Sequence, residues 1–252
     1  TGIVMLLAFF FLYQTYIQNI IYDERLNQME EVTHQMFQNL EDVIDSQWNR
    51  VMEECNYLRE ANVQTIDELC KYMKKKYELS AYEEQKITLI AVDSEGGYYT
   101  ERGNRGLFRD LDYFEDNPKQ ISFVFDSMTD NQSEMVFLER LSKPIQLQNG
   151  KKKTTIRYFG IAQNMEQLNP YFNCDAYDRN NSVYVLDDNG FKLFNSNKVE
   201  LIKGHNVFSV LQKMKYLHNS SFAKTKTELE KKGCSYSNAV LDGTEYFYAL
   251  KR

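Results

Sequence analysis

The chain contains few of the residues that interrupt regular structure. Of its 252 residues only 3 are Pro and 11 are Gly. Residues 14–59 include neither, so no residue in this stretch breaks a helix. Trp occurs once and His three times. Long uninterrupted elements are therefore expected, and a site built from clustered histidines is not.

Sequence motifs of the common enzyme classes are also missing. The chain has no G-x-S-x-G, no H-E-x-x-H, no phosphate-binding loop and no dinucleotide fingerprint. His34, His205 and His218 occur singly, without metal-ligand spacing. Asp187 begins a segment like the start of a calcium loop, but no Glu closes it at the required spacing, so a turn is favoured. The sequence predicts no enzyme in this segment, no metal and no cofactor.

Positive charge and cysteine are both sparse. The chain has 30 Lys and Arg against 36 Asp and Glu, which disfavours nucleic acid as a partner. The run Lys151–Lys152–Lys153 follows Asn149 and Gly150 and is interpreted as a solvated turn. The spacing of the cysteines matches no zinc pattern and leaves both disulfides and buried free thiols open. They are Cys55, Cys70, Cys174 and Cys234.

One long apolar run lies at the start of the chain. Residues 3–13 are almost wholly apolar, but they are fewer than the roughly 20 that span a bilayer. They fit either the outer part of a transmembrane helix or the core of a signal peptide. No small-residue cleavage site follows, and Tyr13, Tyr16 and Tyr22 lie where an interfacial aromatic belt would lie. We favour a membrane helix for residues 1–13.

Residues 14–60 have the pattern of one long amphipathic helix. Apolar residues recur there at intervals of three and four. At 1.5 Å per residue such a helix is about 65–70 Å long, which exceeds the diameter of a small domain. The apolar stripe fits either sheets of the same chain or a second copy of the helix. We favour the first for the distal half of the helix, and we also expect a homodimer through the N-terminal helix.

The rest of the chain divides into two units with strand patterns. In residues 61–168 we expect a helix over 63–77, a hairpin over 87–100, a covering loop over 103–118, and three strands over 121–125, 135–138 and 155–161. In residues 169–252 we expect strands at 183–186 and 191–194, helices at 207–216 and 222–232, and a final hairpin turning at Asp242–Gly243. The segments 92–96 and 186–190 repeat the order apolar residue, acidic turn, Gly at an offset of 94 residues.

With these features the chain resembles the double Cache family of bacterial sensor domains. The long helix, the two hairpins over 87–100 and 183–194, and the closing strands over 235–250 carry the resemblance. It implies an α+β fold in which two PAS-like antiparallel sheets lie along the helix, the first sheet (61–168) farther from the membrane than the second (169–252). The segment with Trp48 looks most like sensors of hybrid histidine kinases. Diguanylate cyclase receptors and chemoreceptors carry the same modules.

The resemblance also implies where and how such a domain works. The sensor lies outside the cytoplasm, a second membrane helix follows Arg252, and a cytoplasmic output domain comes after it. The family often binds a small ligand in the distal module. In an amino-acid-binding version an Arg lies near a Trp and a second aromatic residue, with an Asp further on. Arg109, Tyr113 and Asp126 are the nearest match, but the Trp is absent there, which argues against free amino acids.

The residues themselves suggest a recognition site in the first unit. Aromatic walls with a few charges suit a small polar ligand, and an Arg can hold a carboxylate at two points. A protein-interaction ectodomain without a small ligand and a secreted enzyme are the rival interpretations. The candidate ligand-binding residues are Tyr98, Tyr99, Arg102, Arg105, Arg109, Tyr113, Phe123, Phe125 and Asp126.

Overall fold

The computed structural model describes residues 2–78, 86–107, 119–124, 134–172, 182–196, 201–218 and 220–252. The chain divides into two compact units. We call Leu40–Asn173 the six-stranded unit, and Thr1–Asn39 together with Cys174–Arg252 the C-terminal unit. The first helix, α1, contributes its beginning to the C-terminal unit and its end to the six-stranded unit.

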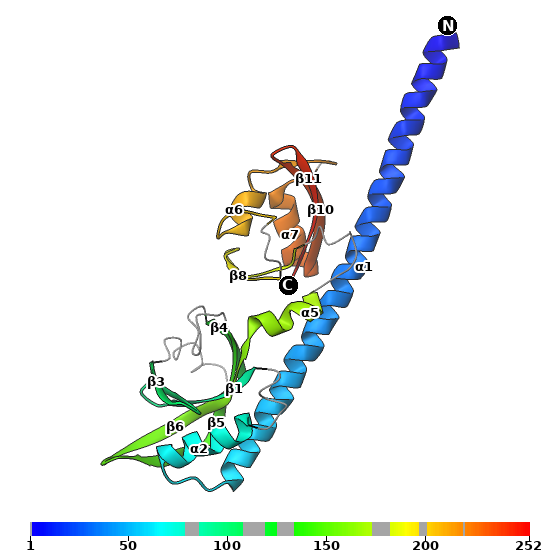
Figure 1. Cartoon of the computed structure of the whole chain (residues 1–252). Helices are drawn as coiled ribbons and strands as arrows, with labels where there is room; N and C mark the ends of the chain where they lie inside the picture. Colours follow the sequence, from blue (N-terminus) through cyan, green and yellow to red (C-terminus); the bar gives the residue numbers. More distant parts are fainter. Residues whose placement is uncertain are drawn as a thin grey trace. The chain divides into compact units, whose positions relative to one another are not determined.

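The helix α1 runs without a break over Gly2–Glu60, as the absence of Pro and Gly predicted (Figure 1). Its 59 residues give it a length of about 90 Å. Val51, Cys55 and Leu58 are at most 1% exposed, so the stripe at its C-terminal end packs inside its own unit. Near its beginning, Tyr22 stacks on His218 with ring centroids 3.9 Å apart. The apolar stripe is therefore used by sheets of the same chain.

The six-stranded unit is an antiparallel sheet with α1 and α2 on one side. The strand order is β3-β2-β1-β6-β5-β4. Its elements are α2 (Ile66–Tyr77), β1 (Ile87–Asp93), β2 (Gly97–Thr100), β3 (Gly103–Leu107), β4 (Lys119–Val124), β5 (Glu134–Asn149) and β6 (Lys152–Asn164), followed by a short 3-10 helix (Met165–Leu168) and α5 (Asn169–Phe172). The predicted hairpin β1–β2 and the strands β4, β5 and β6 are confirmed.

Two features of this sheet differ from the sequence-based expectation. The loop expected over 103–118 begins with a strand, β3, because residues 103–107 pair with β2 at the edge of the sheet. The strands β5 and β6 are much longer than predicted and form one hairpin that turns at Gly150. A register shift between Arg140 and Ile145 accommodates Pro144, which is why the strand continues past that residue.

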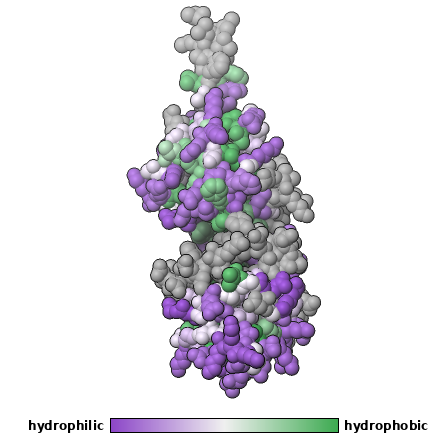
Figure 2. Space-filling model, turned by 90° about the vertical axis from the view of Figure 1, so that its left-hand side faces the viewer, coloured by the Kyte–Doolittle hydropathy of each residue, from purple (hydrophilic) through white to green (hydrophobic). Residues whose placement is uncertain are grey.

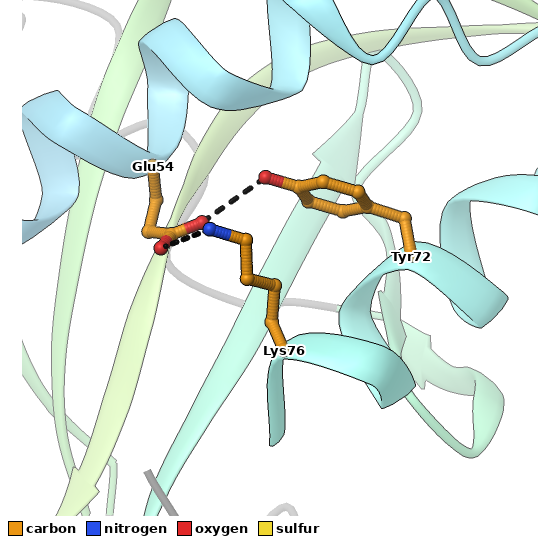
Figure 3. A network of polar contacts seen from close by, with 3 residues as sticks. All are labelled: Glu54, Tyr72 and Lys76. Carbon is orange, nitrogen blue, oxygen red and sulfur yellow. Dashed lines mark hydrogen bonds and ion pairs between the residues drawn. The ribbon is translucent and has the colours of Figure 1, made fainter. Parts of the chain in front are cut away.

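The helix α2 begins at a capping box and is bonded to α1. Thr65 accepts the amide of Glu68 at 3.1 Å, and the carboxylate of Glu68 accepts the amide of Gln64 at 2.7 Å. Glu54 on α1 receives two donors from α2: the Lys76 ammonium at 3.0 Å and the Tyr72 hydroxyl at 3.1 Å (Figure 3). These contacts fix α2 against α1 on one side of the sheet.

In its described part the C-terminal unit contains a three-stranded sheet, β11-β10-β9, and a two-stranded sheet, β7-β8. Its elements are β7 (Tyr184–Leu186), β8 (Lys192–Asn195), α6 (Val207–Leu211), β9 (Lys215–Tyr216), α7 (Phe222–Lys232), β10 (Cys234–Leu241) and β11 (Thr244–Lys251). The predicted α7 ends at Gly233, which has φ of 72°, and the final hairpin turns at Asp242–Gly243, both as expected. The helix expected over 207–216 is shorter, because Lys215 and Tyr216 pair with β10 instead.

The repeat seen in the sequence is also a repeat in structure. The Oδ1 atom of Asp93 accepts the amides of Glu95 and Gly97 at 2.9 and 2.8 Å. The Oδ1 atom of Asp187 accepts the amides of Asn189 and Phe191 at 2.9 and 2.7 Å. Gly96 and Gly190, three residues after each Asp, have φ of 85° and 84°. Both units therefore contain the same Asp-capped turn after an equivalent strand.

The surface on the side shown in Figure 2 is mainly hydrophilic, with small hydrophobic areas between. Among the described residues of α1, the large exposed apolar side chains gather mainly before residue 22. They are Phe10, Leu12, Tyr13, Tyr16, Ile20 and Ile21. No helix in the described part of the chain contains a stretch long and apolar enough to cross a membrane.

Candidate ligand-binding site

Strand register sorts the residues of the six-stranded sheet onto two faces. Trp48 of α1 meets the ring of Phe137 edge-on, with centroids 5.4 Å apart, so Phe137 faces the helices. Successive strand residues point to opposite faces. Val136 and Leu138 therefore lie on the face away from α1, opposite Ala162 and Gly160 of β6. We call this the far face.

The far face is an apolar surface that is fully buried. Its core residues are at most 1% exposed, and Tyr98 packs against them. They are Ile90, Val92, Val136, Leu138, Tyr158 and Ala162. Because α1 and α2 lie on the other side of the sheet, neither helix buries this surface. An apolar surface with a few polar groups at its margin is a common setting of a small-molecule site.

Tyr98 carries the polar chemistry of the far face. Burial raises the pKa of its hydroxyl, Arg105 lowers it, and Glu134 raises it. The hydroxyl therefore lies within electrostatic reach of one guanidinium and one carboxylate. Because its pKa lies above the ordinary value, the hydroxyl stays protonated at neutral pH and serves as both donor and acceptor.

Glu134 and Asn164 lie opposite each other at the same margin of the sheet. They are directly paired in the β5–β6 register, and they are 4% and 7% exposed. The Oδ1 atom of Asn164 accepts the amide of Glu166 at 2.7 Å, which fixes the orientation of its side-chain amide. A buried carboxylate beside an amide and a phenol suits a ligand that brings hydrogen-bond donors or a positive charge.

Of the candidate residues from the sequence, the structure brings Tyr98 and Arg105 together. Arg105 lies at the register shift between β2 and β3 and is exposed. Tyr99 points to the other face, is 3% exposed, and donates its hydroxyl to Oδ2 of Asp93 at 3.1 Å. Arg102 is exposed and pairs with its neighbour Glu101 at 3.3 Å. Tyr99 and Arg102 therefore belong to the turns of the sheet, and not to the far face.

The other candidates are less fully placed. Phe123 lies in β4, opposite Met135 in the register. Arg109, Tyr113, Phe125 and Asp126 lie outside the described residues. Sequence reasoning missed Glu134, Tyr158 and Asn164. Glu134 lies one residue before the predicted strand 135–138, and Asn164 lies three residues after the predicted strand 155–161, which contains Tyr158. Extending the alternation of side chains to these positions would have placed all three residues on the face of Val136.

The C-terminal unit has a chain of hydrogen-bonded polar groups in its interior. The Tyr248 hydroxyl donates to the Tyr216 hydroxyl at 2.8 Å, and that hydroxyl donates to the carbonyl of Leu211 at 3.0 Å. Burial and the bond with Tyr248 raise the pKa of Tyr216. Thr225 lies 3.2 Å from the Tyr248 hydroxyl and extends the chain of bonds. These polar groups satisfy one another, which is typical of a core and not of a ligand site.

A pocket of about 420 Å³ lies within the C-terminal unit, between α1 and the three-stranded sheet. Lys251 occupies one end of it, with its ammonium 3.2 Å from Nδ1 of His34 and 4.4 Å from the ring centre of Phe37. Burial raises the pKa of Tyr236 to about 12, with Cys234 and then Glu30 adding to the effect. The pocket is open to solvent along its helix edge, where the exposed Glu30 and Glu31 line it.

Within the described residues, no three His, Cys, Asp or Glu side chains are grouped so as to bind a metal ion. The thiols of Cys55, Cys70 and Cys234 are free, and Cys174 lies outside the described residues. Burial raises the pKa of Cys55 to about 12, so its thiol is not a nucleophile at neutral pH.

No protein-family model matches the chain, and no curated protein matches it by sequence. Solved structures do. The ligand-binding domain of the Campylobacter jejuni chemoreceptor Tlp3, in complex with L-valine, superimposes with a TM-score of 0.52 at 13% identity. The sensory domain of the same chemoreceptor with isoleucine bound gives 0.52 at 11% identity. Each match covers 91% of this chain and 89% of the other.

This chain has the fold of a chemoreceptor sensory domain. The likeness spans both units, and it confirms the α+β fold with a long N-terminal helix and antiparallel sheets that the sequence predicted. The two solved domains bind amino acids and are not described as enzymes.

Proposed function

We propose that this chain is the extracytoplasmic ligand-sensing domain of a transmembrane signalling receptor, and that the far face of the six-stranded sheet binds a small polar molecule. The observation that carries the proposal is the position of Tyr98. It combines a buried apolar surface with a phenol, the guanidinium of Arg105 and the carboxylate of Glu134. The domain itself binds and does not catalyse.

The far face favours a ligand with both a donor group and an acid group. Glu134 suits an amino or other donor group, and Arg105 suits a carboxylate. Tlp3 binds L-valine and isoleucine on the same fold. An amino acid or a related zwitterion is accordingly the first class of ligand to test on this chain, although the sequence lacks the tryptophan of the amino-acid-binding version.

The wider receptor follows from the same proposal. Residues 1–13 form the outer part of a membrane helix, and α1 carries the signal toward it. Ligand binding alters the packing of the sheet against α1, and a small shift of a packed helix serves as a two-state switch. The ligand must bind the two states with different affinity for any signal to pass. The exposed apolar side chains before residue 22 support a homodimer through α1.

The output domain is proposed as that of a sensor histidine kinase, of the hybrid type, in a phosphorelay. A chemoreceptor output is the second candidate, because the two matched structures with this fold come from a chemoreceptor. A diguanylate cyclase is the third. The gene sequence downstream of Arg252 decides among them: a kinase, a methyl-accepting or a cyclase region identifies the output directly.

The binding proposal is tested by thermal unfolding of the purified domain with a panel of amino acids, amines and small carboxylates. At least one compound is expected to raise Tm, and Glu134→Gln or Tyr98→Phe should remove the rise. Tyr171→Phe is the matched control, since Tyr171 is 44% exposed on α5. An equal rise in Tm in all variants would show that the far face does not bind the compound. No rise with any compound would favour a structural ectodomain.

A further inference from the structure

The hairpin formed by β5 and β6 is the most basic part of the chain. Residues 140–157 include six Lys and Arg and no Asp or Glu. The whole chain has 30 Lys and Arg against 36 Asp and Glu, so the rest carries 24 against 36. The sequence alone predicts a solvated turn at the three adjacent lysines. The structure shows that they form the tip of an extended two-stranded arm.

This arm, residues 140–157, extends beyond the rest of the sheet, and we call it the basic hairpin. Pairing of β4 with β5 ends at Lys119–Glu139, and pairing of β1 with β6 ends at Asp93–Ile156. The β5–β6 pairing continues to Asn149–Lys152. Figure 1 shows this hairpin running past the ends of the other strands. A bridge from Gln148 to Thr65 attaches it to the start of α2, and the carbonyl of Thr155 accepts the amide of Ser94 at 2.9 Å.

The turn of the basic hairpin is hydrogen-bonded, and its lysines are exposed to solvent. The side-chain amide of Gln148 donates to the carbonyl of Gly150 at 2.9 Å, which closes the turn. Lys151, Lys152 and Lys153 are exposed, and in the described part of the chain none of them forms an ion pair. The charges are therefore available, and little ordering of the backbone is needed for binding.

The outer face of the hairpin combines cations with neutral hydrogen-bonding groups. In the register Lys153 lies opposite Gln148, and Thr155 lies opposite Gln146, so these four side chains share one face. The other face contains Leu147, which is 1% exposed and packs inward. The outer face thus offers two amides, a hydroxyl and the ammonium group of Lys153 without any carboxylate, and the exposed Lys151 and Lys152 lie beside it at the turn.

The lack of exposed hydrophobic side chains near the hairpin limits which class of ligand can bind to its outer face. Among the described residues from 108 to 170 there is no large exposed hydrophobic side chain. Protein interfaces depend on buried aromatic or aliphatic anchors, and membrane-surface segments insert apolar side chains. Figure 2 shows a predominantly hydrophilic surface on the described lower part of the molecule, where this hairpin lies. A protein interface built on apolar anchors and a segment that inserts into a membrane do not fit this composition.

We propose that the basic hairpin binds a linear anionic glycopolymer, a chain with repeated phosphate or carboxylate groups on a hydroxyl-rich backbone. The lysines neutralise the repeated anions, and the Gln and Thr side chains bond to the hydroxyl groups. Binding releases counterions and weakens as salt concentration rises. The site is separate from the far face, so it does not depend on the proposed small-molecule ligand.

The test is the binding of the whole domain to immobilised polyglycerol phosphate and to polygalacturonate, which separate a phosphate from a carboxylate polymer. The variant K152E/K153E is compared with K224E/K226E, which reverses two exposed lysines on α7 and changes the net charge equally. At about 0.15 M salt the hairpin variant should bind about tenfold or more weakly than the wild type, and the control should bind within about twofold.

Three outcomes would overturn the proposal. No measurable binding of either polymer by the wild type would do so. An equal loss in both variants would show attraction by net charge alone. Binding of poly-L-glutamate as tightly as the glycopolymers would indicate an acidic protein partner. Unchanged Tm values for both variants keep the comparison free of folding effects, and retained thermal shifts by small molecules keep it separate from the far face.

Discussion

Lys76 lies 3.0 Å from a carboxylate oxygen of Glu54, and this ion pair joins the two helices on one side of the six-stranded sheet. The Lys76 ammonium also lies 4.1 Å from the ring centre of Tyr57, and Tyr72 bonds to the second carboxylate oxygen (Figure 3). The side chain of Glu54 is only 4% exposed. Removing Lys76 takes an ion-pair partner from a buried carboxylate, which costs more than the loss of a surface pair.

We expect Lys76→Met to lower the free energy of unfolding by about 2–3 kcal/mol, because the carboxylate of Glu54 stays buried. Urea unfolding at pH 7 measures it. The matched control is Lys74→Met, whose pair with Glu78 has a distance of 3.9 Å and side chains 64% and 63% exposed. That change should cost less than about 0.5 kcal/mol. Equal effects of the two changes would contradict a buried clamp.

Asp93→Ala should destabilise the chain more than Asp187→Ala, although the two turns have the same hydrogen bonds. Asp93 is 6% exposed and also accepts the Tyr99 hydroxyl, whereas Asp187 lies at a more exposed turn. The expected losses are about 3 and about 1 kcal/mol. Chemical unfolding of the two variants measures these losses in the free energy of unfolding. A larger loss for Asp187→Ala would contradict the prediction that Asp93 contributes more stability.

Gly160→Ala should prevent normal folding of the six-stranded sheet. A Cβ atom at this position would lie 1.8 Å from the carbonyl oxygen of Phe137, so β5 or β6 would have to move. We expect a loss of more than about 3 kcal/mol or an insoluble protein. Gly150→Ala is the control, because a Cβ there meets nothing within 4 Å and only its φ of 61° opposes the change. A soluble Gly160→Ala variant with unchanged Tm would show that the strands can separate at this point.

Stability should fall as pH rises above 9, with Cys55 as one cause. Burial raises the pKa of this thiol from 9.0 to about 12, so the unfolded chain ionises before the folded one. Its contribution is complete below pH 9 and is lost as pH rises toward 12, by about 4 kcal/mol in total. Urea unfolding from pH 8 to about pH 10.5 should show a shallower decline in Cys55→Ala. Identical slopes would mean that the thiol ionises freely when folded.

Cys55 should also resist thiol reagents in the folded protein. At pH 8 only about one molecule in ten thousand has a Cys55 thiolate, given a pKa near 12. Mass spectrometry after iodoacetamide treatment should find Cys55 labelled only after unfolding. Rapid labelling of Cys55 in the native state, at the rate of the half-buried Cys234, would contradict its burial.

Sequence patterns predicted the helices and turns that depend only on residues close to one another in the chain. The unbroken α1 follows from the lack of Pro and Gly, α7 from Gly233, and the two Asp-capped turns from Asp followed by Gly at the third position. The same rules failed where a partner strand decided the conformation. Residues 103–107 look like a loop but pair with β2, and residues 215–216 look helical but pair with β10.

The sequence by itself determined the long helix and the two repeated Asp-capped turns, because each of these depends on residues near one another in the chain. Only the tertiary structure decided which side of each strand is used. A shift of one residue moves a side chain to the opposite face, so Tyr98 and Tyr99, adjacent in sequence, were separated into a candidate site and a turn. Glu134 and Asn164 came together for the same reason: thirty residues apart in the chain, they are directly opposite in the sheet.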